Sequence, residues 1–266
     1  MSRALELTKT ATWWPSVLWQ TTTLSLVNDG EQLLVDPGIA PWEVREAARE
    51  GVAHVLITHA DWDHVMGIGL LPEATVYATS TAAERIRSGE ARASVERLSR
   101  QFTLPLEGLD GLRVDELLVP APDETAVGPW TAVCHPAPGH TPDGVATWLP
   151  EEQLLVAGGY LSQNEIPFIY DSAWSYRETL SMLAGLIERE RPDHVVVGHG
   201  SPHDADEALR VAVEDMAYVE RVVGFAEAGG EPEGASSVPY PDRGGWSDAE
   251  EHAGNIRRAC EAVAGG

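Results

Sequence analysis

The chain has 266 residues, 42 acidic and 18 basic, and a formal net charge of −24 at pH 7. This balance argues against a nucleic-acid partner, because binding phosphate backbones depends on lysine and arginine. The only cysteines, Cys134 and Cys260, form no disulfide framework, and no run of about 18 apolar residues suited to crossing a membrane occurs. Residues 1–9 lack the apolar core of a signal peptide, so we expect a soluble cytoplasmic protein without a membrane partner.

The first predicted elements form a β-hairpin. Residues 21–27 alternate polar and apolar side chains, Asn28-Asp29-Gly30 marks a turn, and residues 32–35 form the second strand. The hairpin ends at Asp36, beside a proline and a glycine. This aspartate either belongs to the turn or is a carboxylate that orients a metal-binding loop, and both interpretations remain open.

A helix over residues 41–51 leads to an apolar, β-branched strand at residues 54–58. Two histidines and two aspartates follow this strand within six residues, namely His59, Asp61, Asp63 and His64. Imidazoles and carboxylates suit zinc, manganese or iron, so this stretch predicts a metal site. The alternative is a polar loop in which Asp61 or Asp63 caps a helix. Histidines at two later strand ends favour the metal site.

The middle of the chain is predicted to mix strands and helices. A short helix begins within residues 65–70, and a strand follows at residues 75–78. The charged segment 81–98 is expected to be a surface helix without a function. Further strands at residues 114–119 and 130–135 lead to a loop rich in proline and glycine at residues 136–144. This stiff loop carries His140 and is a good mounting for a metal ligand.

A second hairpin, with strands at residues 145–149 and 153–157, ends at Gly158-Gly159. The apolar and aromatic segment 160–170 is expected to be a pocket wall, with a packed surface loop as the alternative. The remaining predicted elements are a helix at 175–189, a strand at 194–197 that ends at His199, a helix at 204–227, a flexible stretch at 229–245 and a terminal helix at 247–264.

No boundary divides the chain, so we expect a single domain over residues 1–266 with a C-terminal helical extension at about 204–266. Sheets packed face to face, with helices outside, would bring the strand ends together along one edge. Of the five further histidines, three are expected to be structural or to support the ligands: His54, His135 and His194. The other two, His203 and His252, could line the same edge, although only the closeness of His203 to His199 in the chain supports this.

Taken together, these motifs resemble the metallo-β-lactamase superfamily. They are Asp36-x-Gly38, His59-x-Asp61-x-Asp63-His64, Gly139-His140-Thr141-Pro142, Gly158-Gly159 and Gly198-His199-Gly200. The resemblance covers roughly residues 20 to 200 and implies an α+β fold, a four-layer αββα sandwich, with one or two metal ions at its edge. The ions are usually zinc and sometimes iron or manganese. Carried over to this chain, the resemblance implies one site of His59, Asp61 and His140, and another of Asp63, His64 and His199.

Two positions depart from the family's pattern. Asp61 stands where a histidine is usual, and Gly159 stands where an aspartate usually bridges the two metals. The ligand set of this chain contains two aspartates, Asp61 and Asp63, as the family's usual set does, so the formal charge of the ligands is preserved. Because glycine offers no side-chain ligand, the metals must be bridged by water, substrate or a displaced carboxylate such as Asp61, or only one metal binds well.

The leading hypothesis is hydrolysis, in which a metal-bound water attacks an ester, lactone, thioester or amide carbonyl of a small molecule. Asp63 could accept a proton as well as bind metal, and Tyr160, Phe168 and Tyr170 would contact the substrate. A second hypothesis is a metal- or ligand-binding protein whose catalysis is impaired by the absent bridging aspartate. Iron-dependent oxygen chemistry is a third, because the first site contains two histidines and a carboxylate.

Overall fold

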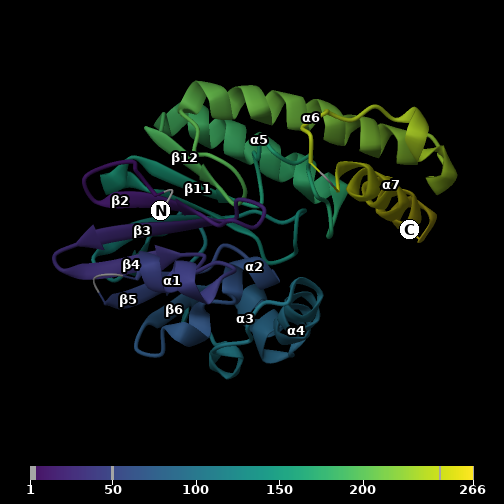
Figure 1. Ribbon diagram of the computed structural model, residues 1–266. Coiled ribbons are helices and arrows are strands. Elements are labelled where there is room, and N and C mark those ends of the chain that lie inside the picture. Colours follow the sequence, from purple (N-terminus) through teal and green to yellow (C-terminus); the bar gives the residue numbers. More distant parts are fainter. Residues whose placement is uncertain (1–3, 49–50, 246, 266) are drawn as a thin grey trace.

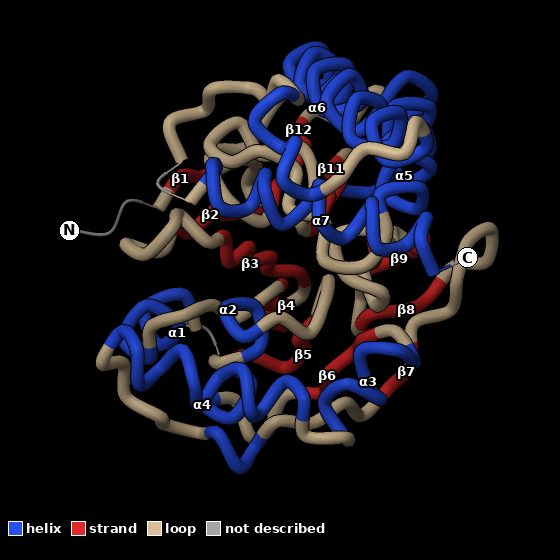
Figure 2. Tube along the Cα trace, turned by 90° about the vertical axis from the view of Figure 1, so that its right-hand side faces the viewer, coloured by secondary structure: helices blue, strands red, loops and turns tan. Residues whose placement is uncertain are grey.

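The computed structural model describes residues 4–48, 51–245 and 247–265, and in it two β-sheets lie face to face between two layers of helices (Figure 1). This is the predicted four-layer αββα sandwich of the α+β class. Figure 2 shows the strands running through the middle, with helices on either side. Among the described residues, no helix has the length and apolar character needed to cross a membrane.

The first sheet has the strand order β1-β2-β3-β4-β5-β6-β7 and the second has the order β12-β11-β10-β9-β8. The strands of the first are β1 (Leu5–Glu6), β2 (Ala11–Pro15), β3 (Thr22–Asn28), β4 (Glu31–Val35), β5 (Val52–Leu56), β6 (Thr75–Ala78) and β7 (Glu116–Leu117). Those of the second are β8 (Thr125–Val127), β9 (Trp130–Pro136), β10 (Val145–Leu149), β11 (Leu154–Gly158) and β12 (His194–Val197).

Strand directions bring the loops that matter to one edge. Strands β4 and β5 are parallel, so the loops that follow them leave from the same end of the first sheet. In the second sheet β9 and β11 both run antiparallel to β10, and β12 is parallel to β11. The loops after β9, β11 and β12 therefore also share one end. The backbone N–H of Val145 donates to Thr58 O at 2.9 Å, which joins the two sets of loops across the sandwich.

Helices pack on both outer faces. One side carries α1 (Pro41–Ala47), α2 (Trp62–Val65), α3 (Ser80–Arg87) and α4 (Glu90–Phe102), and the other carries α5 (Ala173–Glu190), α6 (Ala205–Glu227) and α7 (Asp248–Gly265). Short 3-10 helices lie at Ile68–Leu70, Leu109–Gly111, Pro150–Glu152 and Pro232–Ser237.

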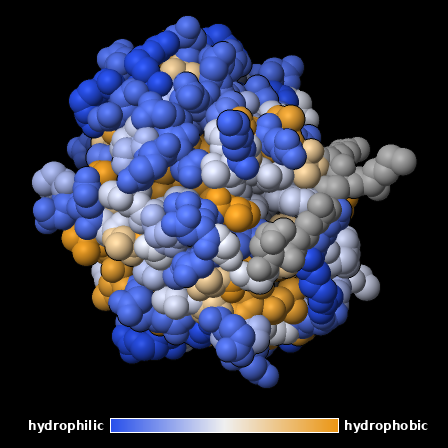
Figure 3. All heavy atoms as spheres, turned by 90° about the vertical axis from the view of Figure 1, so that its left-hand side faces the viewer, coloured by the Kyte–Doolittle hydropathy of each residue, from blue (hydrophilic) through white to orange (hydrophobic). Residues whose placement is uncertain are grey.

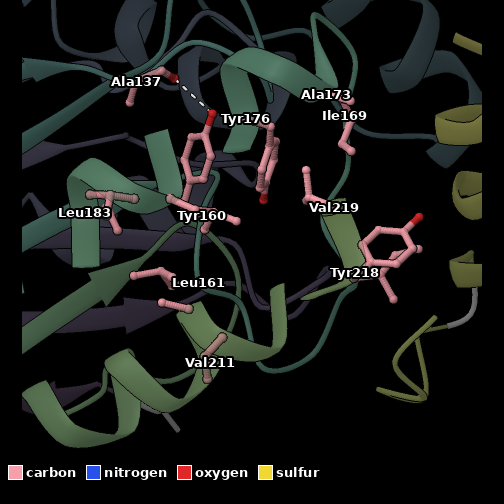
Figure 4. Close-up of a cluster of buried hydrophobic side chains, with 14 of the residues drawn as sticks. Ala137, Tyr160, Leu161, Ile169, Ala173, Tyr176, Leu183, Val211, Tyr218 and Val219 are labelled. Atoms are coloured by element: carbon pink, nitrogen blue, oxygen red, sulfur yellow. Dashed lines mark hydrogen bonds between the residues drawn. The ribbon is translucent and has the colours of Figure 1, made fainter. Parts of the chain in front are cut away.

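Three buried apolar clusters hold the layers together. One lies between the sheets and includes Leu26, Leu33 and Val156. A second lies between the first sheet and its helices. The third joins the second sheet to α5, α6 and α7, and its large side chains Tyr160 and Tyr176 are drawn in Figure 4. Burial of these apolar surfaces is the main favourable term for the fold.

Several predicted elements have different bounds in the structure. The charged segment 81–98 forms two helices, α3 and α4, because Gly89 has a φ of +87° and interrupts the helix. The helix predicted at 41–51 ends at Ala47, and residues 49–50 lie outside the described residues. The stretch at 229–245, predicted to be flexible, contains the 3-10 helix Pro232–Ser237.

Candidate metal centre

The loop after β5 places four acidic or imidazole side chains at the edge of the first sheet. His59 and His64 are 1% and 0% exposed, and Asp63 is 6% exposed. Asp61 occupies the N-cap position of α2, but its side chain makes no capping hydrogen bond. The alternative interpretation, in which Asp61 or Asp63 caps the helix, is therefore not supported, because the Asp61 carboxylate makes no capping bond and Asp63 lies inside α2.

Loops of the second sheet complete two donor groups. His140 follows β9 and joins His59 and Asp61 in the first group, whereas His199 follows β12 and joins Asp63 and His64 in the second group. Within each group one ligand atom per residue lies within 4.8 Å of the others. The groups adjoin, because the His59 and His64 rings have centroids 4.1 Å apart. The structure thus brings together all six residues that the resemblance implied.

The two aspartates face the Nε2 atoms of the histidines. In the first group Asp61 Oδ2 lies 3.9 Å from His59 Nε2 and 3.7 Å from His140 Nε2. In the second group Asp63 Oδ2 lies 3.6 Å from His64 Nε2 and 3.4 Å from His199 Nε2. Each group therefore presents two imidazole nitrogens and one carboxylate oxygen to a common centre.

The opposite ring nitrogen, Nδ1, has a partner in every one of these histidines. His140 Nδ1 donates to the carbonyl of Phe168 at 2.7 Å, and His64 Nδ1 donates to Asp36 Oδ2 at 2.9 Å. His59 Nδ1 lies 2.9 Å from Thr58 Oγ1, and His199 Nδ1 lies 3.3 Å from the carbonyl of Trp19. A proton on Nδ1 leaves the Nε2 lone pair available to a metal.

Asp36 supports both histidines of the β5 loop. Its Oδ2 accepts hydrogen bonds from the Thr58 hydroxyl at 2.6 Å and from His64, and its Oδ1 accepts from the Thr58 N–H at 2.8 Å. Because Thr58 gives its own proton to Asp36, its oxygen is free to accept from His59 Nδ1. This geometry favours the orienting role for Asp36 over a simple turn residue.

Burial and charge set the protonation of these groups. Burial lowers the pKa of His59 and of His140, which favours the neutral form that binds metal. For His64, burial works to lower the pKa, but Asp63 and Asp36 outweigh it and raise the pKa to about 9. For Asp63, burial works to raise the pKa, but His64 and His199 outweigh it and lower that pKa.

Two buried nitrogens indicate that these groups suit a metal ion. Nε2 of His59 and Nε2 of His64 are inaccessible to solvent, and neither has a hydrogen-bond partner among the described residues. Buried polar atoms are nearly always paired, so unpaired imidazole nitrogens that face carboxylates need another explanation. A cation such as Zn²⁺, which binds imidazole nitrogen and carboxylate oxygen, would satisfy both atoms.

Gly159 lies directly against the first donor group. A Cβ at this position would fall 2.3 Å from His140 Cδ2 and 2.7 Å from His140 Nε2. The space that a side chain at position 159 would need is therefore filled by the imidazole of His140. This contact could not be foreseen from the sequence, which showed only that position 159 offers no ligand.

Within the segment 160–170 only Tyr170 is exposed, and the other residues are buried or half-buried. Tyr160 is 2% exposed, and its hydroxyl accepts from His140 N at 3.0 Å and donates to Pro138 O at 2.6 Å. The same hydroxyl lies 3.2 Å from Ala137 O, the hydrogen bond drawn in Figure 4. These hydrogen bonds of the Tyr160 hydroxyl therefore anchor the backbone of the loop that carries His140. Tyr170 is 44% exposed, and its ring centroid lies 5.5 Å from that of His140. Phe168, which lies between these two tyrosines in the chain, is half-buried.

A small cavity of about 30 Å³ adjoins both groups, lined by His140, Gly159, Glu165, Tyr176 and His199 among others. Glu165 is a member of this site that the sequence analysis did not single out. Its Oε1 lies 3.9 Å from His199 Nδ1, and burial raises its pKa. Glu165 lies in the long loop between β11 and α5, and no sequence motif marks it.

Thr21 and Arg85 are two more residues that the sequence did not reveal. The Thr21 hydroxyl donates to Asp63 Oδ2 at 3.1 Å. Arg85, from α3, reaches Asp61 Oδ1 with Nη2 at 3.0 Å, although its helix was expected to face solvent. The five other histidines lie outside both groups, and four of them bond elsewhere: His54 to Glu31, His194 to Leu7, His203 to Leu161 and His252 to Tyr218.

Comparison with known proteins gives three kinds of match. The sequence profile described as "Metallo-beta-lactamase superfamily" matches residues 18–200. A curated metallo-beta-lactamase type 2 from Bacillus sp. (strain 170) is 28% identical over 163 residues, which are 60% of this chain and 56% of the relative.

Among solved structures, the stereoselective inverting sec-alkylsulfatase Pisa1 from Pseudomonas sp. matches with a TM-score of 0.77 and 13% identity, over 98% of this chain and 50% of that chain. A metallo-beta-lactamase family protein from Thermus thermophilus matches with a TM-score of 0.63 and 22% identity, over 93% of each chain. At these identities the solved structures show a shared fold. The chain spans only about half the length of the Bacillus and Pseudomonas proteins, at 56% and 50%.

Proposed function

The chain belongs to the metallo-beta-lactamase superfamily, and on that premise we propose that it is a metal-dependent hydrolase of a small-molecule ester, lactone, thioester or amide. One observation carries the proposal. Four histidines with anchored Nδ1 atoms point Nε2 at two carboxylates, and two of those buried Nε2 atoms have no hydrogen-bond partner in the part of the chain that the structure describes. Zinc is the metal that we expect, in one or two ions, with iron or manganese as alternatives.

Bound zinc would supply a Lewis acid for the carbonyl oxygen and a water of lowered pKa. The protein's own residues would orient that chemistry. Thr21 holds Asp63 Oδ2 toward the centre, and the lowered pKa of Asp63 keeps this carboxylate ionised, which is the form that binds a metal. Tyr170 stands at the exposed side of His140, where it would contact the substrate.

Elemental analysis of the purified protein, combined with turnover of ester and lactone substrates, tests the proposal. We expect bound zinc and hydrolysis that a chelator abolishes and added Zn²⁺ restores. His140→Ala removes a donor from the first group and His199→Ala removes one from the second, so each should lower the metal content and the hydrolysis rate. His135→Ala is the matched control, because His135 lies close in sequence to His140 but outside both groups.

Three other results would contradict the proposal. Wild-type protein that binds no zinc, iron or manganese would exclude a metal centre. Bound metal without hydrolysis would favour a binding protein in which Gly159 has impaired catalysis. Bound iron with oxygen uptake would favour oxidative chemistry, which is compatible with the two histidines and one carboxylate of the first group.

A further inference from the structure

Arg85 joins two aspartates beside the first donor group. Its Nη2 lies 3.0 Å from Asp61 Oδ1, its Nη1 pairs with Asp143 Oδ1, and its Nε lies 2.8 Å from Glu90 Oε1. The arginine side chain is 14% exposed, so water screens these interactions only weakly. A planar guanidinium with fixed donor directions can hold two carboxylates at a set angle, which a lysine cannot do.

Asp143 fixes Arg85 to the frame of the site. The side chain of Asp143 is fully buried, and its Oδ2 accepts a hydrogen bond from the backbone N–H of Ala60 at 2.6 Å. Ala60 lies between His59 and Asp61, and Asp143 lies in the same loop as His140. The aspartate therefore connects the two loops that supply the first group, and it holds the guanidinium next to Asp61.

Arg85 determines which oxygen of Asp61 faces the histidines. With Oδ1 held by the guanidinium, Oδ2 is the atom that lies 3.9 Å from His59 Nε2 and 3.7 Å from His140 Nε2. An aspartate side chain is shorter than a histidine side chain, so its orientation decides whether it reaches the centre. Burial works to lower the pKa of Arg85, but Asp143 and Asp61 raise it further above its ordinary range, and the guanidinium stays charged.

We propose that Arg85 is a positioning residue that holds Asp61 as the carboxylate donor of the first group, an inference that rests on the proposed metal centre. In this scheme Arg85, Asp143 and Asp61 act together as a replacement for a histidine donor at position 61. Residues that orient metal ligands in this way typically contribute about 10- to 100-fold to metal affinity.

Titration of the metal-free protein with Co²⁺, followed by visible absorption and by competition with a chelator, tests the proposal. His140→Ala and His199→Ala first identify which absorption change belongs to which group. We then expect Arg85→Gln to weaken Co²⁺ binding at the first group by about 10- to 100-fold and to leave the second group unchanged. Arg85→Lys, which keeps the charge but loses the fork, should lie between Arg85→Gln and wild type.

Arg87→Gln is the matched control. Arg87 lies on the same helix, but its side chain is 76% exposed and pairs only with Glu84 among the ion pairs of the described residues. This variant should bind Co²⁺ at both groups like the wild type.

The Asp61→His background separates positioning from a general structural role. A histidine at position 61 donates through a ring nitrogen and has no second oxygen for Arg85 to hold. Adding Arg85→Gln to Asp61→His should therefore change first-group affinity by less than about twofold, well below the effect expected for a positioning residue.

Two results would overturn the proposal: wild-type affinity in Arg85→Gln, or an equal loss from Arg85→Gln in the Asp61→His background. Failure of the metal centre itself would look different, because the wild-type protein would then bind neither Co²⁺ nor Zn²⁺.

Discussion

At the scale of single residues, the four central histidines follow one scheme in which Nδ1 is anchored and Nε2 faces a carboxylate. The anchors differ, and Asp36 serves two of the histidines, His64 directly and His59 through Thr58. Asp36 itself adopts a φ of +50°, an uncommon conformation for an aspartate, at the end of β4. Strain of this kind often occurs where a side chain must point in a required direction.

Gly159→Ala tests whether the contact between position 159 and His140 matters. The new Cβ would fall 2.3 Å from His140 Cδ2, and the ring cannot easily retreat because its Nδ1 is bonded to Phe168 O at 2.7 Å. We expect Zn²⁺ affinity at the first group, measured by chelator competition, to fall about tenfold. Gly185→Ala is the control, since a Cβ at that position would come within 4 Å of no described atom beyond its chain neighbours and the backbone of its own helix. Unchanged affinity in Gly159→Ala would show that His140 can move.

The raised pKa of His64 predicts how the stability of the metal-free protein depends on pH. Its folded-state pKa of about 9 lies above the ordinary value of 6.5, so its protonated ring stabilises the fold fully below pH 6.5. That contribution is lost as the pH rises from 6.5 through 9, by at most about 1.4 kcal/mol per pH unit. Urea unfolding of chelator-treated protein at several pH values measures this slope.

The variant His64→Gln should lose this part of the pH dependence. His59 and His140 do not interfere in that range, because a lowered histidine pKa affects stability only below the ordinary value of 6.5. A slope that is identical in His64→Gln and wild type would contradict the assignment to His64.

At the scale of elements, the C-terminal helix α7 holds the segment 160–170 in place, and part of this segment forms a wall of the cavity beside the donor groups. Asn255 of α7 is fully buried, its Oδ1 accepts from Ile169 N at 3.0 Å, and its Nδ2 donates to Pro167 O at 2.7 Å. The hydroxyl of Tyr170 bonds to Glu251 of the same helix at 3.0 Å. The family profile ends at residue 200, so the contacts that shape this wall come from a part of the chain outside the match.

Asn255→Ala should lower the stability of the fold and loosen the segment 160–170. It leaves the N–H of Ile169 and the carbonyl of Pro167 buried without their partner, which costs about 2 to 4 kcal/mol of unfolding free energy. We also expect a higher KM and faster proteolysis within residues 160–170. Glu261→Ala, on the exposed side of α7, should leave all three measurements unchanged. Wild-type KM in Asn255→Ala would show that the wall does not depend on α7.

At the scale of the whole molecule, the negative charge of the protein predicts a preference among substrates of the proposed hydrolase. The formal net charge is −24, and hydrophilic residues cover most of the face shown in Figure 3, between smaller hydrophobic patches. Three arginines lie near the site, and each already pairs with a carboxylate: Arg85 with Asp61, Arg243 with Asp215 and Arg258 with Glu251. These arginines therefore form ion pairs with carboxylates of the protein itself, which compete with any anionic substrate.

A neutral substrate should consequently be hydrolysed faster than an anionic one of the same size. We expect kcat/KM for 4-nitrophenyl butyrate to exceed that for the 4-nitrophenyl monoester of succinate by about tenfold or more at low salt. The difference should shrink as salt screens the surface charge. Equal rates at low salt, or a preference for the succinate ester, would contradict this expectation.

The layers and the clustering of the six donor residues could be predicted because motifs at strand ends are visible in the sequence and together carry the family resemblance. Apolar strands that end in histidine or aspartate are visible in the chain, and parallel strands bring such ends together. Arg85 and Asn255 could not be predicted, because each acts through a partner distant in sequence. The helix of Arg85 has a charged pattern typical of a solvated surface, and only its packing beside the β5 loop shows that one arginine turns inward.

Each donor group takes two residues from the loop after β5 in the first sheet and one from a loop of the second sheet. A bound ion would therefore cross-link the halves of the sandwich in the manner of a disulfide, but one that a chelator could remove. In the metal-free protein the two layers would separate transiently more often along this edge. Amide hydrogen exchange in the loops of His140 and His199 would then report metal occupancy directly, without any substrate.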